Sequence, residues 1–415
     1  MRLRWLIVLL TAIGIRSSFS GHLELFAQQK HSYTLQELLA LGKEYNPDLA
    51  VGVQQVAALE AAYQASKRLF NPELELHYGR AESHDGLERR TARGIALTQP
   101  LENPFKRRHR IRAMENAWEA ERHTQTYRGL NVSFDIKSEV FFILMLEKNE
   151  DLFRQTVESI QKTQALIEIR ARLGEVKPLE AIKLQVETLK ARQKMNALQA
   201  EREIAQETLN NLLGNMLPPH YSLQGALEYT PRTWDEEGLV ARALDIHPLI
   251  LADEQRVEQA ASRILYTKWQ RFPDLALRGF SDNELDGVNR GVGITFDIPL
   301  WNFRSKEIAE AQSLSQKAEA ELRALRLDIG KEIRSRIRQV RLAQETLDIF
   351  STGLLRQAEE SLRLSEISYR EGEISLLEFL DSQRTYNTIL QDYHQALYAW
   401  NIAAAALEKA LGESL

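Results

Sequence analysis

Two carboxylates near the C-terminal end of the chain have the spacing that places both on one face of a helix. Glu378 and Asp381 are three residues apart in the segment YREGEISLLEFLDS, residues 369–382, and helix positions i and i+3 are neighbours. Acidic side chains so close together either attract cations or form an ordinary solvated helix face, and the residues alone leave both interpretations open. Glu180 holds the matching position in a related segment, ARLGEVKPLEAIKL, residues 171–184.

No catalytic or metal-binding motif accompanies these carboxylates. The nine histidines are scattered without metal-ligand spacing, and the count of zero cysteines excludes thiol catalysis, thiolate metal sites and disulfides. The chain contains no nucleophile elbow, phosphate loop or dinucleotide fingerprint. The sequence therefore predicts a protein that is not an enzyme and that has neither a cofactor nor a metal site.

The two acidic segments belong to a tandem duplication. Each contains a glycine that interrupts a helical pattern, and these glycines, Gly174 and Gly372, are 198 residues apart. The two copies, each about 200 residues long, are joined by a proline-containing linker over residues 215–233. Six of the eleven prolines pair at offsets of 199–201 residues: Pro47 with Pro248, Pro72 with Pro273, and Pro100 with Pro299.

Each copy is predicted to contain a helix, a strand hairpin and two long helices that reverse at the glycine. The alternation of Val292, Ile294, Phe296 and Ile298 with small and polar residues is typical of a strand, in a membrane or in a soluble hairpin with one wet face. Asn103 and Asn302 are expected to cap the long helices, with Pro104 at the first helical position of the first. No proline follows between Pro104 and Gly174, and none follows Pro299. The expected helical regions are 33–70, 104–214, 234–271 and 301–412, and the expected hairpins are 71–100 and 272–300.

The N-terminal residues 1–20 resemble a secretory signal, with Arg2 and Arg4 before a short apolar run; cleavage at 27 is an alternative. Removal of residues 1–20 takes away three arginines and no acid, which changes the formal charge from −5 to −8. The longest later apolar stretch, VFFILML at 140–146, is too short to span a bilayer as a helix. A mature chain that spans a membrane must therefore use strands.

The basic run KRRHR at 106–110 does not indicate nucleic-acid binding, because it is short and lies in an acidic, exported chain. Its place just after a predicted strand instead suggests contact with lipid headgroups or other anionic groups at a membrane surface.

Over residues 33–412 the chain resembles the TolC family of outer-membrane efflux channels. NPDLAVGVQQVAALEAAYQASKRLFNPELEL and LTQPLENPFKRRHRIRAME are similar to the cobalt-zinc-cadmium resistance (CzcC-like) branch, and YREGEISLLEFLDSQRTY is similar to the family's periplasmic tip and gate. The resemblance implies a mainly α-helical homotrimer with four strands per chain in a 12-stranded outer-membrane β-barrel, above an α-helical barrel of long coiled-coil-like helices. It also implies location in the outer membrane of a diderm bacterium, in contact with outer-membrane lipid.

The function implied is that of a passive conduit of a tripartite efflux system. A periplasmic adaptor and an inner-membrane pump of the resistance-nodulation-division type would be its partners, and divalent heavy-metal cations its substrate. Drug efflux, type I secretion and a soluble periplasmic coiled-coil scaffold are the alternatives.

The resemblance also assigns roles to particular residues. It implies a periplasmic gate at Glu378, Asp381, Glu180 and Tyr369, in which a trimer would bring six carboxylates of Glu378 and Asp381 together. It implies adaptor-docking turns at Arg172, Leu173, Gly174, Arg370, Glu371 and Gly372. Two departures from the family pattern are the lack of a lipidated N-terminal cysteine and the presence of Ile374 where some members carry an arginine.

Overall fold

A computed structural model describes residues 32–82, 89–172, 177–284, 287–297 and 302–413. Helices make up most of these residues, and the described part divides into two compact units. The first unit contains residues 32–51, 128–243 and 329–413, and the second contains residues 52–127 and 244–328. Among the described helices, none is both long and apolar enough to cross a membrane.

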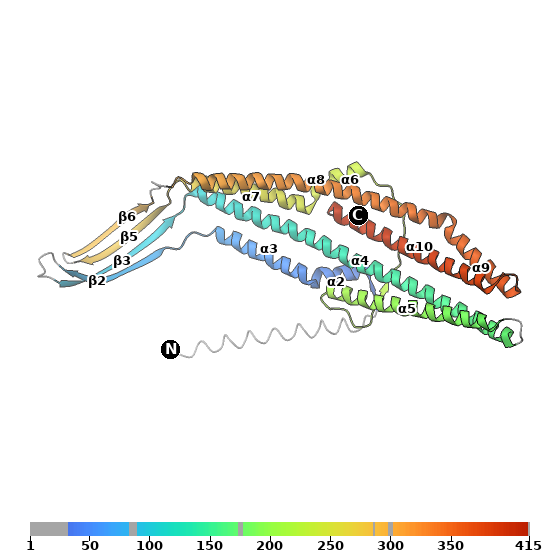
Figure 1. The fold of residues 1–415 in the computed structure, drawn as a ribbon. Helices are drawn as coiled ribbons and strands as arrows, with labels where there is room; N and C mark the ends of the chain where they lie inside the picture. The colour runs from blue at the N-terminus through green and yellow to red at the C-terminus, as the bar shows by residue number, and fades with distance from the viewer. Residues whose placement is uncertain (1–31, 83–88, 173–176, 285–286, 298–301, 414–415) are drawn as a thin grey trace, which may run out of the picture. The chain divides into compact units, whose positions relative to one another are not determined.

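The second unit contains a four-stranded antiparallel sheet with the order β2-β3-β5-β6 (Figure 1). Strands β2 (Glu73–Glu82) and β3 (Arg89–Leu101) come from the first copy of the repeat. Strands β5 (Leu275–Glu284) and β6 (Gly287–Phe296) come from the second. The two hairpins join through β3 and β5, where Leu101 lies opposite Leu275. Strands β2 and β6 are the two edges of the sheet.

The pairing register gives this sheet one apolar and one polar face, because directly opposed residues point to the same side. The polar face carries Glu75, His77 and Arg278, and the Arg278 guanidinium lies 2.9 Å from the Glu75 carboxylate. Phe280 and several small residues share that face. The apolar face carries exposed side chains from all four strands: Leu74, Leu76, Ile95, Leu97, Leu275, Leu277, Val292, Ile294 and Phe296.

The long helices begin after strands β3 and β6, with different local structure in the two copies. Helix α4 (Pro104–Arg172) has 69 residues, about 105 Å at 1.5 Å per residue. Asn103 caps it as predicted, since its side chain accepts a hydrogen bond from Phe105 N–H at 2.9 Å. The expected cap at Asn302 was wrong. Arg304 has a left-handed φ of 52° and cannot belong to a helix, so α8 (Ser305–Ile349) begins three residues later.

Each of the shorter helical regions is divided by a proline that restricts the residue before it to extended backbone. Residues 33–70 form α2 (Leu35–Tyr45) and α3 (Pro47–Ser66), and residues 234–271 form α6 (Glu236–Ile246) and α7 (Pro248–Trp269). Asn46 and His247, at equivalent positions of the repeat, accept the capping hydrogen bonds. Asn46 Oδ1 accepts from Leu49 N–H at 3.0 Å, and His247 Nδ1 accepts from Leu249 N–H at 3.2 Å.

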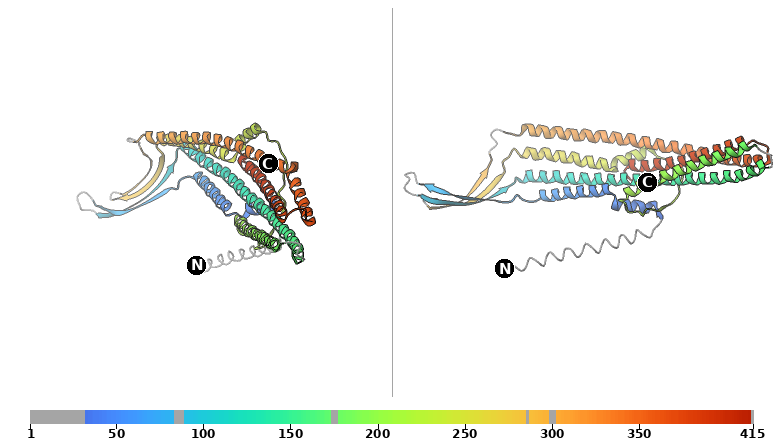
Figure 2. Two further views of the ribbon diagram at one scale, coloured as in Figure 1. Left: turned by 45° about the vertical axis from the view of Figure 1, so that its right-hand side comes forward. Right: turned by 60° about the horizontal axis from the view of Figure 1, so that its bottom comes forward.

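The first unit is a helical bundle. In it, α4 lies beside α5 (Pro178–Leu212), and α9 (Leu355–Glu371) lies beside α10 (Leu376–Leu411) (Figure 2). Ile136, Val140 and Ile143 form an apolar stripe on α4 and are buried in one cluster with Leu38 and Leu209. A second apolar stripe, on α8, is likewise buried at Ile333, Ile337, Val340 and Leu347.

Two features of the first unit were not expected from the sequence. The helix expected to run on to Gly372 is interrupted by a π-helical turn, η1 (Phe350–Leu354), in which Gly353 has a φ of 154°. Only glycine adopts this conformation readily. In addition, β1 (Ser32–Thr34) pairs in parallel with β4 (Ser222–Gln224), which lies within the linker between the copies.

Candidate functional site at the helix turns

The reversal between α9 and α10 occurs at Gly372, as predicted. Gly372 has a left-handed φ of 81°, and its N–H contacts Tyr369 O at 3.1 Å. The next residue, Glu373, donates to Ser368 O at 2.8 Å, which completes a glycine C-cap. The turn predicted between α4 and α5 includes residues 173–176, so Leu173 and Gly174 lie outside the described residues.

The two helix pairs meet close to these turns. The guanidinium of Arg170, near the end of α4, donates a 2.7 Å hydrogen bond to the backbone oxygen of Arg370, near the end of α9. Arg370 forms an ion pair with Glu366, and Arg172 donates to Glu168 O at 3.3 Å. The described ends of α4 and α9 therefore contact one another through Arg370 and through Arg170, two residues before the predicted docking residue Arg172.

Glu378 has a structural role that the sequence analysis missed. Its carboxylate accepts hydrogen bonds from the backbone N–H and hydroxyl of Ser375, which closes a capping box at the start of α10. These bonds, first that from the backbone N–H, hold the pKa of Glu378 below its usual value. Glu378 and Asp381 are both exposed, one turn apart. The spacing Ser-x-x-Glu before an apolar run was the signal that could have identified the capping box.

Tyr369 and Glu180 belong to the same part of the bundle. Tyr369 is buried and stacks on Phe379, with 5.4 Å between ring centroids and 12° between planes. Burial, and then the nearby Glu180 carboxylate, raises the pKa of the Tyr369 hydroxyl to about 12. Glu180 lies within electrostatic reach of Tyr369, although no hydrogen bond joins the two. The N-cap of α5 is Lys177, which forms no side-chain capping bond, so Glu180 does not share the capping role of Glu378.

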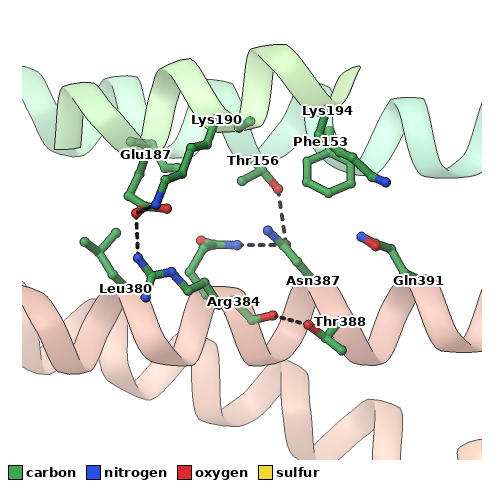
Figure 3. A pocket seen from close by; sticks show the side chains of 13 residues that line it. Phe153, Thr156, Glu187, Lys190, Lys194, Leu380, Arg384, Asn387, Thr388 and Gln391 are labelled. Atoms are coloured by element: carbon green, nitrogen blue, oxygen red, sulfur yellow. Dashed lines mark hydrogen bonds and ion pairs between the residues drawn. The ribbon is translucent and has the colours of Figure 1, made fainter. Parts of the chain in front are cut away.

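A cavity of about 280 Å³ lies between α4, α5 and α10, next to the predicted gate residues (Figure 3). Thr156 and Asn387 point toward one another across it, with 3.2 Å between Thr156 Oγ1 and Asn387 Oδ1. Gln383 donates to the same Asn387 oxygen at 3.2 Å. All three side chains are buried, so polar groups hold α4 and α10 together at this level.

An ion pair joins α5 to α10 at the edge of the same cavity. Arg384 Nη2 lies 2.5 Å from Glu187 Oε1, and Lys190 Nζ lies 3.1 Å from that oxygen. Burial raises the pKa of Glu187, but the hydrogen bonds from Arg384 and Lys190 outweigh burial and leave the pKa lowered. Glu187 is therefore a charged link between helices of the two copies.

The sequence analysis also did not predict the polar contacts between α4 and α10. Asn149, Thr156 and Thr163 recur every seven residues along the buried face of α4. On α10, Asn387 and His394 are likewise seven apart, and His394 Nδ1 lies 2.8 Å from Asn149 Oδ1. A heptad-spaced polar residue within an apolar stripe was the available signal. Among the described residues, no group of three or more His, Asp or Glu side chains has metal-binding geometry.

The repeat in the sequence and the fold that it forms together define a class of protein. Duplicated long helix pairs, connected in sequence to strands of a sheet with one apolar and one polar face, are the architecture of an outer-membrane channel subunit. The model of the family described as "Outer membrane efflux protein" matches residues 38–215 and 239–413. The chain belongs to this family and is an outer-membrane protein, as the sequence analysis predicted.

Individual relatives agree with this assignment. The cobalt-zinc-cadmium resistance protein CzcC of Cupriavidus metallidurans is 22% identical over 385 residues, which cover 91% of this chain and 90% of that protein. The CmeC outer membrane channel of Campylobacter jejuni has a TM-score of 0.77 at 16% identity, with coverage of 91% and 85%. The MtrE outer membrane channel of Neisseria gonorrhoeae has a TM-score of 0.76 at 18% identity, with coverage of 91% and 89%.

Family membership excludes one of the alternative functions expected from the sequence. A soluble periplasmic scaffold is excluded, because the family consists of outer-membrane proteins. Efflux channels are transport proteins rather than enzymes, which agrees with the expectation from the sequence.

Proposed function

We propose that three copies of the chain assemble into one channel in which their sheets close a 12-stranded barrel. The observation that carries this proposal is the sheet itself, with its apolar face and its two free edges at β2 and β6. In lipid, unpaired edge groups are too costly to persist, and four strands cannot close a barrel alone. Pairing of β6 of one subunit with β2 of the next removes both edges and directs the apolar face to lipid.

The channel is a passive conduit of a tripartite efflux system. The turns at Arg172–Gly174 and Arg370–Gly372 dock a periplasmic adaptor, which connects the channel to an inner-membrane pump of the resistance-nodulation-division type. The contact of Arg170 with the backbone of Arg370 supports a joint docking surface formed by both turns.

The acidic residues at the start of α10 form the gate, with Glu180 and Tyr369 as its supporting pair. Two like charges about 8 Å apart repel by roughly 0.5 kcal/mol in water and about 2 kcal/mol at an effective dielectric of 20. A ring that contains Glu378 and Asp381 from three subunits therefore attracts cations. The hydrogen bonds from Ser375 lower the pKa of Glu378 and so favour its charged form.

Divalent heavy-metal cations are the proposed substrate. The similarity to a protein named for cobalt, zinc and cadmium resistance supports this choice, as does the acidic gate. A conduit does not need to bind what it passes, so selection can reside in the pump. Drug efflux and type I secretion are the competing outcomes of the test.

Two measurements test the proposal. Outer-membrane fractions should contain trimers that dissociate on heating, and a channel that remains monomeric there would refute the shared barrel. A strain that lacks the chain should become sensitive to cobalt, zinc and cadmium salts and recover with the wild-type chain. Sensitivity to drugs alone, or loss of a secreted protein without metal sensitivity, would assign the channel to one of the other systems.

A further inference from the structure

Aromatic and basic side chains gather in the second unit where the strands pass into helices. Phe70, Phe105 and Phe272 are large exposed aromatics in this region, and Phe105 stacks on Trp269 with 4.6 Å between ring centroids. The basic run 106–110 follows Phe105 directly in the sequence, and the Arg110 guanidinium lies 5.4 Å from the centroid of the Phe70 ring. Aromatic girdles flank the apolar band of membrane barrels, and basic residues favour anionic headgroups. This junction therefore has the composition of a membrane–water interface.

Two adjoining cavities open at the junction. The first, about 430 Å³, is lined mainly by apolar side chains that include Leu101 and Leu275, two residues that lie opposite one another on the apolar face of the sheet. The second, about 780 Å³, is lined by three arginines of α4, with Ile111 and Asn116 among its other residues. Leu69, Glu102 and Pro104 line both cavities. An apolar compartment next to the lipid-facing surface thus continues into a basic one.

Two carboxylates, Glu102 and Glu115, also line the second, basic cavity, and each already accepts hydrogen bonds from another side chain. Glu102 receives two hydrogen bonds from the Arg110 guanidinium, at 2.9 and 2.7 Å. Glu115 accepts a 2.7 Å hydrogen bond from the hydroxyl of Tyr63. The Glu102 carboxylate is thus paired with Arg110, and Glu115, the other acid of the cavity, places one negative charge against the three arginines.

Those arginines keep much of their binding capacity. Arg108 forms no ion pair with a described residue, Arg112 comes only within 3.7 Å of Glu258, and Arg107 donates to the backbone oxygen of Lys67. Burial, and then the positive charges of Arg108 and Arg112, lowers the pKa of His109 between them, which indicates a positive local potential.

Asn116 supplies an independent sign of a missing ligand. Its side chain is only 8% exposed and lines the basic cavity. Its Nδ2 is buried and has no hydrogen-bond partner among the described residues. A buried donor without a partner is destabilising, so a ligand that offers an acceptor at this position would satisfy it.

We propose that the two cavities bind an anionic phospholipid, with an acyl chain in the apolar cavity and the phosphate at Arg107, Arg108 and Arg112. Asn116 donates to a phosphate or glycerol oxygen. This inference rests on the proposed insertion of the sheet in the membrane, but not on the exported substrate. The cavities lie at the end of the strands from which the long helices of the proposed periplasmic part continue. The bound lipid therefore comes from the periplasmic leaflet. Lipopolysaccharide of the opposite leaflet is therefore not the ligand.

The test uses native mass spectrometry of full-length trimers to compare their retention of phosphatidylglycerol with their retention of phosphatidylcholine. The wild-type trimer should retain phosphatidylglycerol at least tenfold better than phosphatidylcholine. Combined Arg107→Gln, Arg108→Gln and Arg112→Gln substitutions should reduce this preference at least tenfold. The matched control, Arg122→Gln with Arg154→Gln and Arg192→Gln, removes the same charge elsewhere and should leave the preference unchanged.

A second variant covers the case in which the triple variant does not assemble. Asn116→Leu preserves bulk but removes the donor, and it should lower phosphatidylglycerol retention severalfold with trimers intact. Equal losses in the arginine variant and its control, unchanged retention in Asn116→Leu, or preference for lipid A would overturn the proposal. Absence of wild-type trimers from the outer membrane would instead count against the proposed channel.

Discussion

Glu378 and Ser375 form a reciprocal pair at the start of α10. Glu378 Oε2 lies 2.7 Å from Ser375 N and 2.9 Å from Ser375 Oγ, while Glu378 N–H donates back to Ser375 Oγ at 3.3 Å. The side chain proposed as a gate charge therefore also stabilises the helix that presents it. A substitution that removes the charge and the capping hydrogen bonds together cannot show which of the two matters.

The first prediction separates charge from capping. Glutamine also serves at the third position of a capping box, so Glu378→Gln with Asp381→Asn should leave trimers and α10 intact. The loss of charge should abolish block by a trivalent cation added from the periplasmic side and weaken cation selectivity in planar bilayers.

Ser375→Ala is the matched control for that experiment. It should destabilise the start of α10 by about 0.5–2 kcal/mol and keep the trivalent block, because both carboxylates remain. If the doubly neutralised channel is blocked as strongly as the wild type, Glu378 and Asp381 are only a solvated helix face.

The second prediction concerns the turn at Gly372. A Cβ at this position would meet no atom within 4 Å, so the only cost of a side chain is the left-handed φ of 81°, about 1–2 kcal/mol for most residues. Gly372→Val should distort the turn and abolish cross-linking to the adaptor while trimers persist. Gly372→Asn should retain cross-linking, because asparagine tolerates this conformation. Normal cross-linking of the valine variant would contradict the docking role of the turn.

The third prediction follows from the two faces of the sheet. Ile294 lies opposite Leu277 on the apolar face, and Thr295 lies opposite Ala276 on the other. Ile294→Arg would place a charge in lipid, at about 2–4 kcal/mol near the midplane, and should greatly reduce heat-sensitive trimers in the outer-membrane fraction. Thr295→Arg should insert normally. Equal amounts of trimer from both variants would remove the basis for the proposed barrel.

The fourth prediction uses His247, the cap of α7. Burial lowers its pKa to about 4, and protonation of Nδ1 would end its acceptance of the Leu249 N–H. The unfolded chain, with a histidine pKa near 6.5, binds more protons, so stability is complete above about pH 6.5 and is lost as pH falls toward 4. The loss should reach about 2 kcal/mol per chain at pH 5.

His247→Asn should remove most of this pH dependence while keeping a cap, since Asn46 caps α3 at the equivalent position. The measurement is the difference between melting temperatures at pH 7.5 and pH 5.0. The exposed control His220→Asn should leave the wild-type difference unchanged. An unaltered difference in the His247 variant would show that this histidine does not sense pH.

Much of the architecture was predictable because it depends on local signals. Proline and glycine act on their own backbone, so the paired prolines and Gly372 predicted the repeat and a reversal. The alternation through Ile294 and Phe296 predicted a strand with one apolar face. Two local features were not predicted. Arg304 adopts a left-handed φ that is unusual for arginine, and Gly353, within a long helical pattern, forms part of a π-turn instead of continuing the helix.

The tertiary structure alone decided which distant side chains meet. Arg384 with Glu187, and Thr156 with Asn387, join helices whose relative rotation and translation depend on all the contacts along them. A shift of one residue would turn each of these side chains away from its partner. The pairing of Leu101 with Leu275 likewise depends on the register between two hairpins, one from each copy. The sequence by itself thus determined the repeat, the turn at Gly372 and the strand faces, whereas helix phase and strand register determined the contacts among α4, α5 and α10 and the pairing of β3 with β5.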